Sequence, residues 1–481
     1  MEERKGFGSN FGFLMAAIGS AVGLGNIWGF PNKMGANGGF TFLILYLVLA
    51  VFCGVIVMIG ELALGRKTGH GAIGAYRILS KKFKWLGWMG VLSAFLILGF
   101  YCALGGYCLK YVTLNVGNLF HAGFGTGTLD GAGVFDALMA NQGECVIYGL
   151  LFVAITMVIV MGGVGGGIEK VCSVGMPALF VMLVICIIRS CTLDGAVEGL
   201  KYMFVPGWAL ANGVIKEAPN FFSVVSTAGG QMFFSLSLGM AAMITYGSYL
   251  DKKENLQKNA IIIVVMDTLV ALMAGLCVIP GRFALDPTGN LGGPSLLFVT
   301  MQNVFDRMGA AGPIFGILFY LLVVFAAVSS SISLLEAVVA HYVDRARDRG
   351  KGDKRKTYSV LAGIAAGILC VVVCLDSLGT AGISPADILG MRGTMEELPT
   401  WSADWLDFFD CIAEGILMPL GALLMSIMYG WEIGPEVVHA EATREGQSFG
   451  AYGWFKICIK YITPLCMLLV LYGQIKEFFF V

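Results

Sequence analysis

Residues 19–31 read Gly-Ser-Ala-Val-Gly-Leu-Gly-Asn-Ile-Trp-Gly-Phe-Pro and lie in the middle of the first long apolar segment, 11–34. By length and hydropathy this segment predicts one membrane-spanning helix. Its centre nevertheless carries four glycines, Asn26 and Pro31, and glycine and proline both weaken a helix. Backbone that unwinds in a bilayer must bond to neighbouring protein or to a bound polar ligand. A glycine-rich helix packed tightly on a neighbour would have the same composition, so this stretch alone leaves both interpretations open.

The overall composition is that of a protein embedded in a membrane. Of the 481 residues, 57% are hydrophobic and 13% charged, whereas soluble domains are about 25% charged. The net charge of −1 offers no electrostatic reason to bind nucleic acid. The thirteen cysteines form neither a C-x-x-C pair nor a Cys/His cluster, so we expect no zinc site and no disulfide framework. The four histidines have no metal-ligand spacing and no nucleophile–base pair is visible, so we do not expect an enzyme.

Apolar segments long enough to cross a bilayer recur eleven times along the chain. Lys and Arg gather in the loops after the second, sixth and eighth segments, whereas loop 118–144 has neither. Because positively charged loops stay in the cytoplasm, we expect a multi-pass protein of the plasma (inner) membrane with a cytoplasmic N-terminus and an extracellular C-terminus. The expected spans are 11–34, 40–66, 87–117, 145–163, 170–190, 217–250, 256–281, 313–343, 358–375, 406–431 and 452–473.

The sixth segment repeats the irregularity of the first. Its centre reads Gly229-Gly-Gln-Met-Phe-Phe-Ser-Leu-Ser-Leu-Gly-Met240, with a glutamine, two serines and glycines at mid-span. Two interrupted spans five apart predict two five-helix repeats with a site between them, inverted because five is odd. We expect a single transporter domain, 1–481, with repeats at 11–190 and 217–431 and an eleventh helix at 452–473. The broken ends would offer N–H groups to an anion and carbonyl oxygens to a cation.

Other polar residues lie at membrane depth. Glu61 ends the second segment, where a carboxylate is costly unless it is paired, and freed N–H groups of a broken helix would suit it. Asp267 in the seventh segment is a candidate site residue for the same reason. Tyr101 in the third segment is either a packing residue or a ligand. Ser329–Ser331 either bond back to their own helix or help to coordinate a hard cation, and a neutral oxygen site suits sodium better than a divalent ion.

Five motifs, taken in order and at their spacing, resemble the neurotransmitter:sodium symporters, the LeuT-type amino-acid transporters, and among them the eleven-helix bacterial branch. The resemblance implies an all-α LeuT fold in which helices 1 and 6 are unwound in mid-membrane. It also implies symport of an amino acid with sodium by alternating access. The motifs are Gly19-Ser-Ala-Val-Gly-Leu-Gly-Asn26, Asn37-Gly-Gly39, Gly60-Glu-Leu-Ala-Leu-Gly-Arg66, Phe233-Phe-Ser-Leu-Ser-Leu-Gly239 and Ser329-Ser-Ser331.

The resemblance implies a substrate site between helices 1, 3, 6 and 8. The substrate carboxylate would meet the amides of Leu24 and Gly25 and the Tyr101 hydroxyl, and its amino group would meet backbone carbonyls. The carbonyls would be those of Ala21, Phe234 and Ser237. The side-chain pocket would consist of Ile97, Tyr101, Phe234, Met240, Ser330 and Leu334, with Ser235 adjoining it.

Two sodium sites follow from the same resemblance. The first would use Ala21, Asn26, Ser235 and Asp267, and would touch the substrate carboxylate. The second would use Gly19, Val22, Ala326, Ser329 and Ser330. Animal relatives bind chloride at the place that corresponds here to Tyr46, Gln231 and Ser235. Asp267 would supply a fixed negative charge there, so we expect no chloride requirement.

The resemblance also implies gates at both ends of the path. Tyr101 and Phe234 would form the lid over the substrate. Arg4 and Asp344, with Phe7 beside them, resemble the inner gate pair. At the outer end the family usually has an arginine where this chain has Gly29. The acidic partner in the tenth segment, Asp407 or alternatively Asp410, therefore lacks its cation, and Lys33, one turn on, is a candidate substitute.

The residue types of the expected pocket constrain the substrate. No charged side chain faces a substrate tail, which favours a neutral amino acid. Met240, where several relatives have Phe, adapts its shape and points to bulky apolar or aromatic side chains. Hydrophobic pockets discriminate by only ~1–3 kcal/mol per methylene, so we expect a range of substrates.

Two alternatives keep the same fold: proton coupling through Asp267, or a sensor that binds an amino acid without moving it. We expect the protein to be a monomer or a weak homodimer in the lipid bilayer. The exact substrate and the ion stoichiometry do not follow from the sequence.

Overall fold

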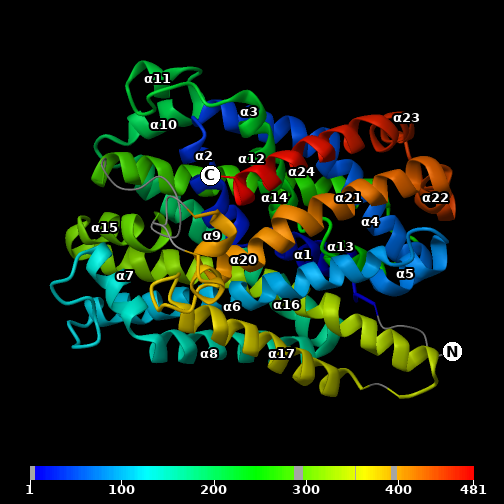
Figure 1. Cartoon of the computed structure of the whole chain (residues 1–481), viewed down its shortest axis with the longest axis horizontal. Helices are drawn as coiled ribbons and strands as arrows, with labels where there is room; N and C mark the ends of the chain where they lie inside the picture. Colours follow the sequence, from blue (N-terminus) through cyan, green and yellow to red (C-terminus); the bar gives the residue numbers. More distant parts are fainter. Residues whose placement is uncertain (1–5, 287–295, 353, 392–397, 481) are drawn as a thin grey trace.

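The computed structural model describes all residues except 1–5, 287–295, 353, 392–397 and 481. The described chain is a bundle of helices that run along the long axis of the molecule, with no strand among them (Figure 1). Among the described residues, nine helices are long and apolar enough to cross a membrane, or ten if the bent pair at the N-terminus is one span. The sixth expected span is absent from this count because it is divided into helices of 15 and 6 residues.

Each of the eleven expected segments corresponds to one helix or to an interrupted series of helices. These are α1 (Asn10–Ala21), η1 (Gly25–Gly29) and α2 (Phe30–Ala36); α3 (Phe40–Leu49), η2 (Ala50–Gly54) and α4 (Val55–Thr68); α6 (Leu86–Leu119); α8 (Gln142–Met161); η3 (Val164–Glu169) and α9 (Lys170–Cys191); α12 (Phe221–Ser235) and α13 (Ala242–Gly247); α14 (Leu256–Leu285); α16 (Gly312–Asp348); α17 (Arg355–Asp376); α20 (Trp405–Asp410), η6 (Cys411–Leu417), α21 (Met418–Ile427) and η7 (Met428–Glu432); and α23 (Tyr452–Ile457), η9 (Cys458–Ile462) and α24 (Thr463–Phe479).

Shorter helices connect the spans at the two ends of the bundle. They are α5 (Ala72–Leu79), α7 (Gly131–Ala140), α10 (Ala196–Phe204), α11 (Trp208–Ala211), η4 (Leu296–Thr300), α15 (Met301–Asp306), η5 (Gly309–Ala311), α18 (Pro385–Leu389), α19 (Thr400–Ala403), α22 (Glu436–Ala442) and η8 (Arg444–Gly446). Helices α7 and α15 lie at the end of the bundle far from the N-terminus (Figure 1).

The first and sixth spans are interrupted, as the sequence predicts. Helices α1 and α2 bend by 47° across the break after Ala21. In the linker between α12 and α13, Ser237, Gly239 and Ala241 all have a positive φ, a conformation that ends the helix. The buried Glu61 accepts a hydrogen bond from the amide of Gly239 at 2.7 Å. The carboxylate of α4 thus satisfies backbone freed by the break, as expected for an acid at this depth.

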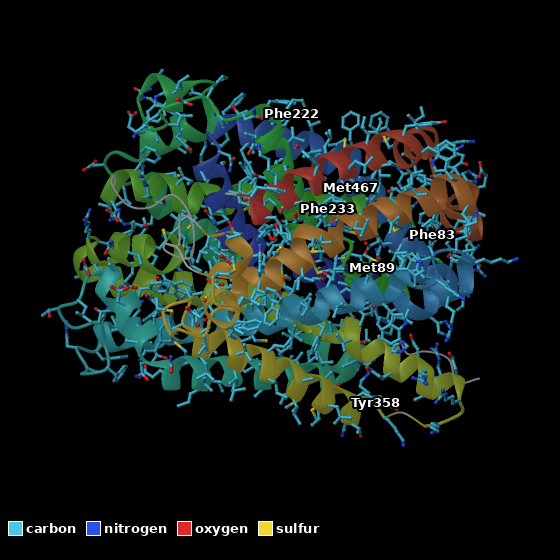
Figure 2. The ribbon with its side chains drawn as sticks, in the orientation of Figure 1. Phe83, Met89, Phe222, Phe233, Tyr358 and Met467 are labelled. Atoms are coloured by element: carbon cyan, nitrogen blue, oxygen red, sulfur yellow. The ribbon has the colours of Figure 1, made fainter. Side chains whose placement is uncertain are left out.

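The bundle buries polar breaks in its centre and leaves apolar side chains on its outside. Helix α16 packs on α6, α8, α9 and α17, and α1 packs on α9, α14 and α16. Phe233 of α12 and Met467 of α24 are buried between their helices, whereas Phe222 at the start of α12 lies at the edge with 67% of its surface exposed (Figure 2). Exposed apolar side chains are stable here because lipid, not water, surrounds the bundle.

Candidate functional site

A small cavity lies at the level where α1 and α12 are interrupted. Its volume is about 10 Å³, which is room for about one water molecule. No charged side chain lines it. Nine of the expected substrate residues form its walls: Ala21, Gly25, Ile97, Tyr101, Phe234, Ser237, Met240, Ser330 and Leu334. The other two, Leu24 and Ser235, touch residues of the same region.

The polar end of the cavity is built by the break in the first span. The Leu24 amide donates to the Tyr101 hydroxyl at 2.8 Å. This N–H has no helical partner because α1 has ended. It bonds instead to the Tyr101 side chain, which lines the cavity. A Cβ on Gly23 would overlap with the hydroxyls of Ser330 and Tyr101, and one on Gly25 would lie 2.8 Å from the Phe234 ring. Only glycine therefore allows the backbone to approach these side chains.

A fully buried carboxylate, Asp267 of α14, gathers polar groups from three other helices. Its Oδ1 accepts from Nδ2 of Asn26 at 2.7 Å. The Ser235 hydroxyl donates to both carboxylate oxygens at 3.0 Å, and the Tyr46 hydroxyl donates to Oδ2 at 3.4 Å. Three residues expected at the first sodium site, Asn26, Ser235 and Asp267, thus lie together. A negatively charged carboxylate surrounded by neutral polar groups is suited to holding a monovalent cation.

A second cluster of oxygens joins α1 to α16. The Ser330 hydroxyl lies 3.3 Å from the carbonyl oxygen of Gly19 and 3.4 Å from that of Val22. The Ser329 hydroxyl lies 3.0 Å from the Ala326 carbonyl oxygen and 3.4 Å from that of Val22. All five residues expected at the second sodium site therefore converge. Their oxygens carry no formal charge, and neutral oxygens of this kind can coordinate a hard monovalent cation.

Two residues of this region were not singled out by the sequence analysis. Ser20 lines the cavity. Its carbonyl oxygen accepts from the Ser237 hydroxyl at 2.8 Å and its own hydroxyl donates to Ser333 at 2.7 Å. Gly23 also lines the cavity. In the sequence, only their position within the glycine-rich motif pointed to Ser20 and Gly23. A break in a helix frees backbone groups throughout such a motif.

At the end expected to be the outer one, Lys33 of α2 forms an ion pair with Glu414 of η6, with 2.5 Å between Nζ and Oε1. Side-chain exposure is 24% for Lys33 and 5% for Glu414. The expected partner was Asp407, with Asp410 as the alternative, and neither forms an ion pair in the described part of the chain. The backbone amide of Asp407 instead donates to the helix-capping Asp404. Lys33 is therefore paired with an acid of the tenth span, but this acid is Glu414 and not the expected one. Gly29 packs against the side chain of Gln231.

At the inner end, Arg4 lies outside the described residues. Its expected partner Asp344 is buried and accepts from the Gly71 amide at 2.8 Å. Phe7 makes edge-to-face contacts with Phe13, Tyr246 and Tyr249, so it packs against the N-terminal end of α1 and the C-terminal end of α13.

Comparison with known proteins identifies the family of this chain. The model of the sodium:neurotransmitter symporter family matches residues 4–119 and 137–479. The chain belongs to the sodium:neurotransmitter symporter family. An uncharacterised sodium-dependent transporter of Bacillus subtilis, YhdH, is 34% identical over 96% of both chains. Another from Haemophilus influenzae is 30% identical over 98% of both. The crystal structure of MhsT in complex with L-phenylalanine is 34% identical, with a TM-score of 0.83 over 98% of this chain and 100% of that one.

This symporter is thus a multi-pass membrane protein of a family of sodium-dependent secondary transporters, not an enzyme. The likeness to MhsT confirms the LeuT fold expected from the motifs.

Replacing Tyr101 of the symporter by Phe is expected to weaken substrate binding by roughly tenfold to a hundredfold, because a hydrogen bond to a charged group contributes about 1.5–3 kcal/mol. Tyr107→Phe is a matched control on the same helix, since the Tyr107 hydroxyl is buried without a partner in the described part of the chain. Equilibrium binding of radiolabelled substrate measures both variants. Equal losses in the two variants would contradict a role for the Tyr101 hydroxyl at the substrate carboxylate.

Proposed function

We propose that this symporter carries a neutral amino acid across the plasma membrane together with sodium, by alternating access. The observation that carries the proposal is the uncharged cavity at the two helix breaks, with one oxygen cluster at Ser330, which lines it, and another around Asp267. Freed N–H groups suit a carboxylate, and the adjacent carbonyl oxygens suit an ammonium group and sodium. The relative MhsT is crystallised with L-phenylalanine. The basic loops support a cytoplasmic N-terminus.

The side chains of the cavity favour an apolar or aromatic substrate. Ile97, Met240 and Leu334 are buried apolar residues of its wall. A cavity of about 10 Å³ is far smaller than an amino acid, so binding requires the walls to move. Met240 is the side chain best able to do so, because an unbranched thioether has several low-energy shapes.

Two sodium ions and no chloride are proposed for each substrate. The neutral cluster around Ser329 and Ser330 and the charged one around Asp267 are separate sets of ligands. Asp267 supplies the negative charge that an anion would otherwise provide. Because sodium and substrate share a site, each raises the affinity of the protein for the other.

The test is the binding of the twenty amino acids to purified protein in sodium chloride, potassium chloride and sodium gluconate. One or a few neutral amino acids should bind in both sodium salts and not in potassium. A need for chloride would contradict the role of Asp267. Binding that persists in potassium would contradict the sodium sites.

The buried carboxylate of Asp267 favours one alternative, coupling to protons rather than to sodium. Uptake into vesicles separates the alternatives: an imposed pH gradient without sodium drives a proton-coupled carrier but not a sodium-coupled one. A protein that binds without accumulating substrate under either gradient would instead be a sensor.

A further inference from the structure

A groove on the outside of the bundle has no part in the proposed transport cycle. It lies between α8 and α17, which run side by side at the edge of the bundle (Figure 1), and it shares no lining residue with the central cavity. Its volume is about 450 Å³, within the range of pockets that bind small molecules, ~300–1,000 Å³. Its lining is apolar throughout and includes Leu150, Val153 and Met157 of α8 and Gly363 and Gly367 of α17.

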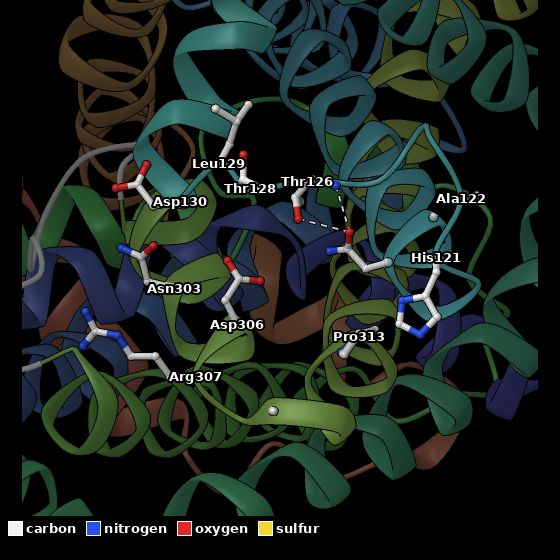
Figure 3. Close-up of a pocket in the computed structure, with 14 residues that line it drawn as sticks. His121, Ala122, Thr126, Thr128, Leu129, Asp130, Asn303, Asp306, Arg307 and Pro313 are labelled. Carbon is white, nitrogen blue, oxygen red and sulfur yellow. Dashed lines mark hydrogen bonds between the residues drawn. The ribbon is translucent and has the colours of Figure 1, made fainter.

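A hollow at the end of the bundle differs from this groove in chemistry. It lies between the loop after α6 and α15, and charged side chains line it, among them Asp130, Asp306 and Arg307 (Figure 3). Water solvates such groups, so this hollow needs no ligand. The groove offers water no polar side chain, and both of its helices are long and apolar enough to cross a membrane. Lipid therefore faces the groove.

The groove is a depression between protruding side chains. Beyond the backbone of its own helix, a Cβ built on Gly367 would contact Leu150 and Val153 at 3.5 and 3.9 Å. These are ordinary van der Waals distances, so the space above this glycine is open. Ile364 and Ile368 beside it are 57% and 62% exposed. A channel left empty between such side chains would lose dispersion contacts on one side, so an apolar group that fits it is favoured there.

The shape of the groove suits a single chain better than a second helix. Two glycines four residues apart can let another helix approach closely, but only one of the two is uncovered here. A Cβ on Gly363 would lie 2.9 Å from the sulfur of Met157, which covers this glycine. An α-helix is about 10–12 Å wide with its side chains, whereas a lipid acyl chain has no side chains and is far thinner.

The length of the groove corresponds to one leaflet of a bilayer. From Gly363 to Val372, α17 rises by about 14 Å, which is close to half of the ~30 Å hydrocarbon core. The Gly363 end is the one nearer the start of α17. There Arg355 approaches Gly163, just after the end of α8, so both helices end at the same level.

Two exposed lysines lie beyond this end of the groove. Lys354 precedes α17 and Lys356 is in its first turn. Lys356 and Gly363 are two helical turns apart and so share a face of α17, separated by about 10 Å along its axis. Neither lysine forms an ion pair with a described residue, whereas Arg355 between them is paired with Glu336 at 2.5 Å. Lysine stems lie along apolar surface and carry their charge to the level of the lipid headgroups.

We propose that this groove binds an anionic phospholipid, with one acyl chain between α8 and α17 and the phosphate at Lys354 and Lys356. The groove selects a chain by its shape, and the lysines select the headgroup by its charge. The bound chain packs α8 against α17 away from the central cavity, so the inference does not rest on the proposed function.

Native mass spectrometry of the delipidated full-length protein in detergent, without substrate or sodium, tests the proposal. The probes are dioleoyl phosphatidylglycerol and phosphatidylcholine with the same chains. Wild type should bind one phosphatidylglycerol saturably. Phosphatidylcholine should bind roughly twenty- to thirtyfold more weakly, about fivefold for each lysine.

Three variants locate the site. Lys356→Gln should bind phosphatidylglycerol about fivefold more weakly and leave phosphatidylcholine unchanged. Gly367→Leu fills the groove and should weaken both lipids at least tenfold. Gly175→Leu is the matched control on α9, where a Cβ would contact Phe325 at 3.7 Å and no residue of the groove. Leucine favours a helix over glycine, so both leucine variants should fold.

Three results would overturn the proposal. Equal lipid binding by Gly367→Leu and Gly175→Leu would show a lipid annulus without a site. Loss of a protein dimer, with lipid binding intact, in Gly367→Leu would make the groove an interface between copies of this chain. A preference for phosphatidylglycerol that is absent in wild type, or that Lys356→Gln leaves unchanged, would exclude the lysines as the headgroup site.

Discussion

Replacing Asp267 by Asn is expected to abolish sodium-dependent substrate binding in chloride-free medium. The carboxylate is fully buried and accepts hydrogen bonds from Asn26 and Ser235. In the proposed function it supplies the negative charge of the first sodium site. A unit charge at ~5 Å with an effective dielectric constant of ~20 contributes about 3 kcal/mol, or more than a hundredfold in sodium affinity. Titration of sodium against a fixed concentration of labelled substrate in gluconate measures the loss.

The same variant should regain part of its sodium affinity when gluconate is replaced by chloride, because the anion restores the missing charge. Asp376→Asn is the control: Asp376 of α17 is also buried and accepts a backbone N–H, that of Trp405, but it is not part of the site. A wild-type sodium affinity in Asp267→Asn, or an equal loss in the control, would contradict the assignment.

Replacing Glu414 by Gln is expected to shift the protein towards a form open at its outer end. The ion pair with Lys33 joins α2, which continues from the substrate site, to η6. Lys33 then keeps only its longer-range attraction to Asp410 and Glu477. A hydrogen bond between charged groups contributes about 1.5–3 kcal/mol, which is roughly tenfold to a hundredfold in the ratio of closed to open forms. Dissociation of bound substrate should accelerate accordingly, and uptake should fall.

The rate at which labelled substrate dissociates after dilution measures the effect. A double variant in which the two charges are exchanged tests whether the ion pair is the cause. Lys33→Glu combined with Glu414→Lys should restore slow dissociation that each single change abolishes. Lys201→Met removes one partner of the exposed pair with Glu198 and should change nothing, since exposed pairs contribute about 0–1 kcal/mol. Normal dissociation in Glu414→Gln would show that this pair does not act as a gate.

Local sequence patterns were enough to predict the membrane class, the spans and the two breaks. Hydropathy over about twenty residues reports the thickness of the bilayer, and glycine and proline weaken a helix wherever it packs. Most residues of the two oxygen clusters belong to short motifs, since Ser329 and Ser330 lie next to each other on α16 and Gly19 to Asn26 lie around one break. Asp267 stands outside these motifs, on α14. The family resemblance supplied the information that these distant motifs meet.

Which acid faces Lys33 was decided by the tertiary structure alone. Asp407, Asp410 and Glu414 all lie within three turns of the tenth span, but residues Cys411–Leu417 form a π-helical turn. The wider turn changes the rotation per residue, so helical periodicity cannot tell which acid points to α2. The sequence by itself determined where the chain crosses and breaks in the bilayer, since those are local properties. Which residues meet across hundreds of positions in the chain was decided only by the packed fold.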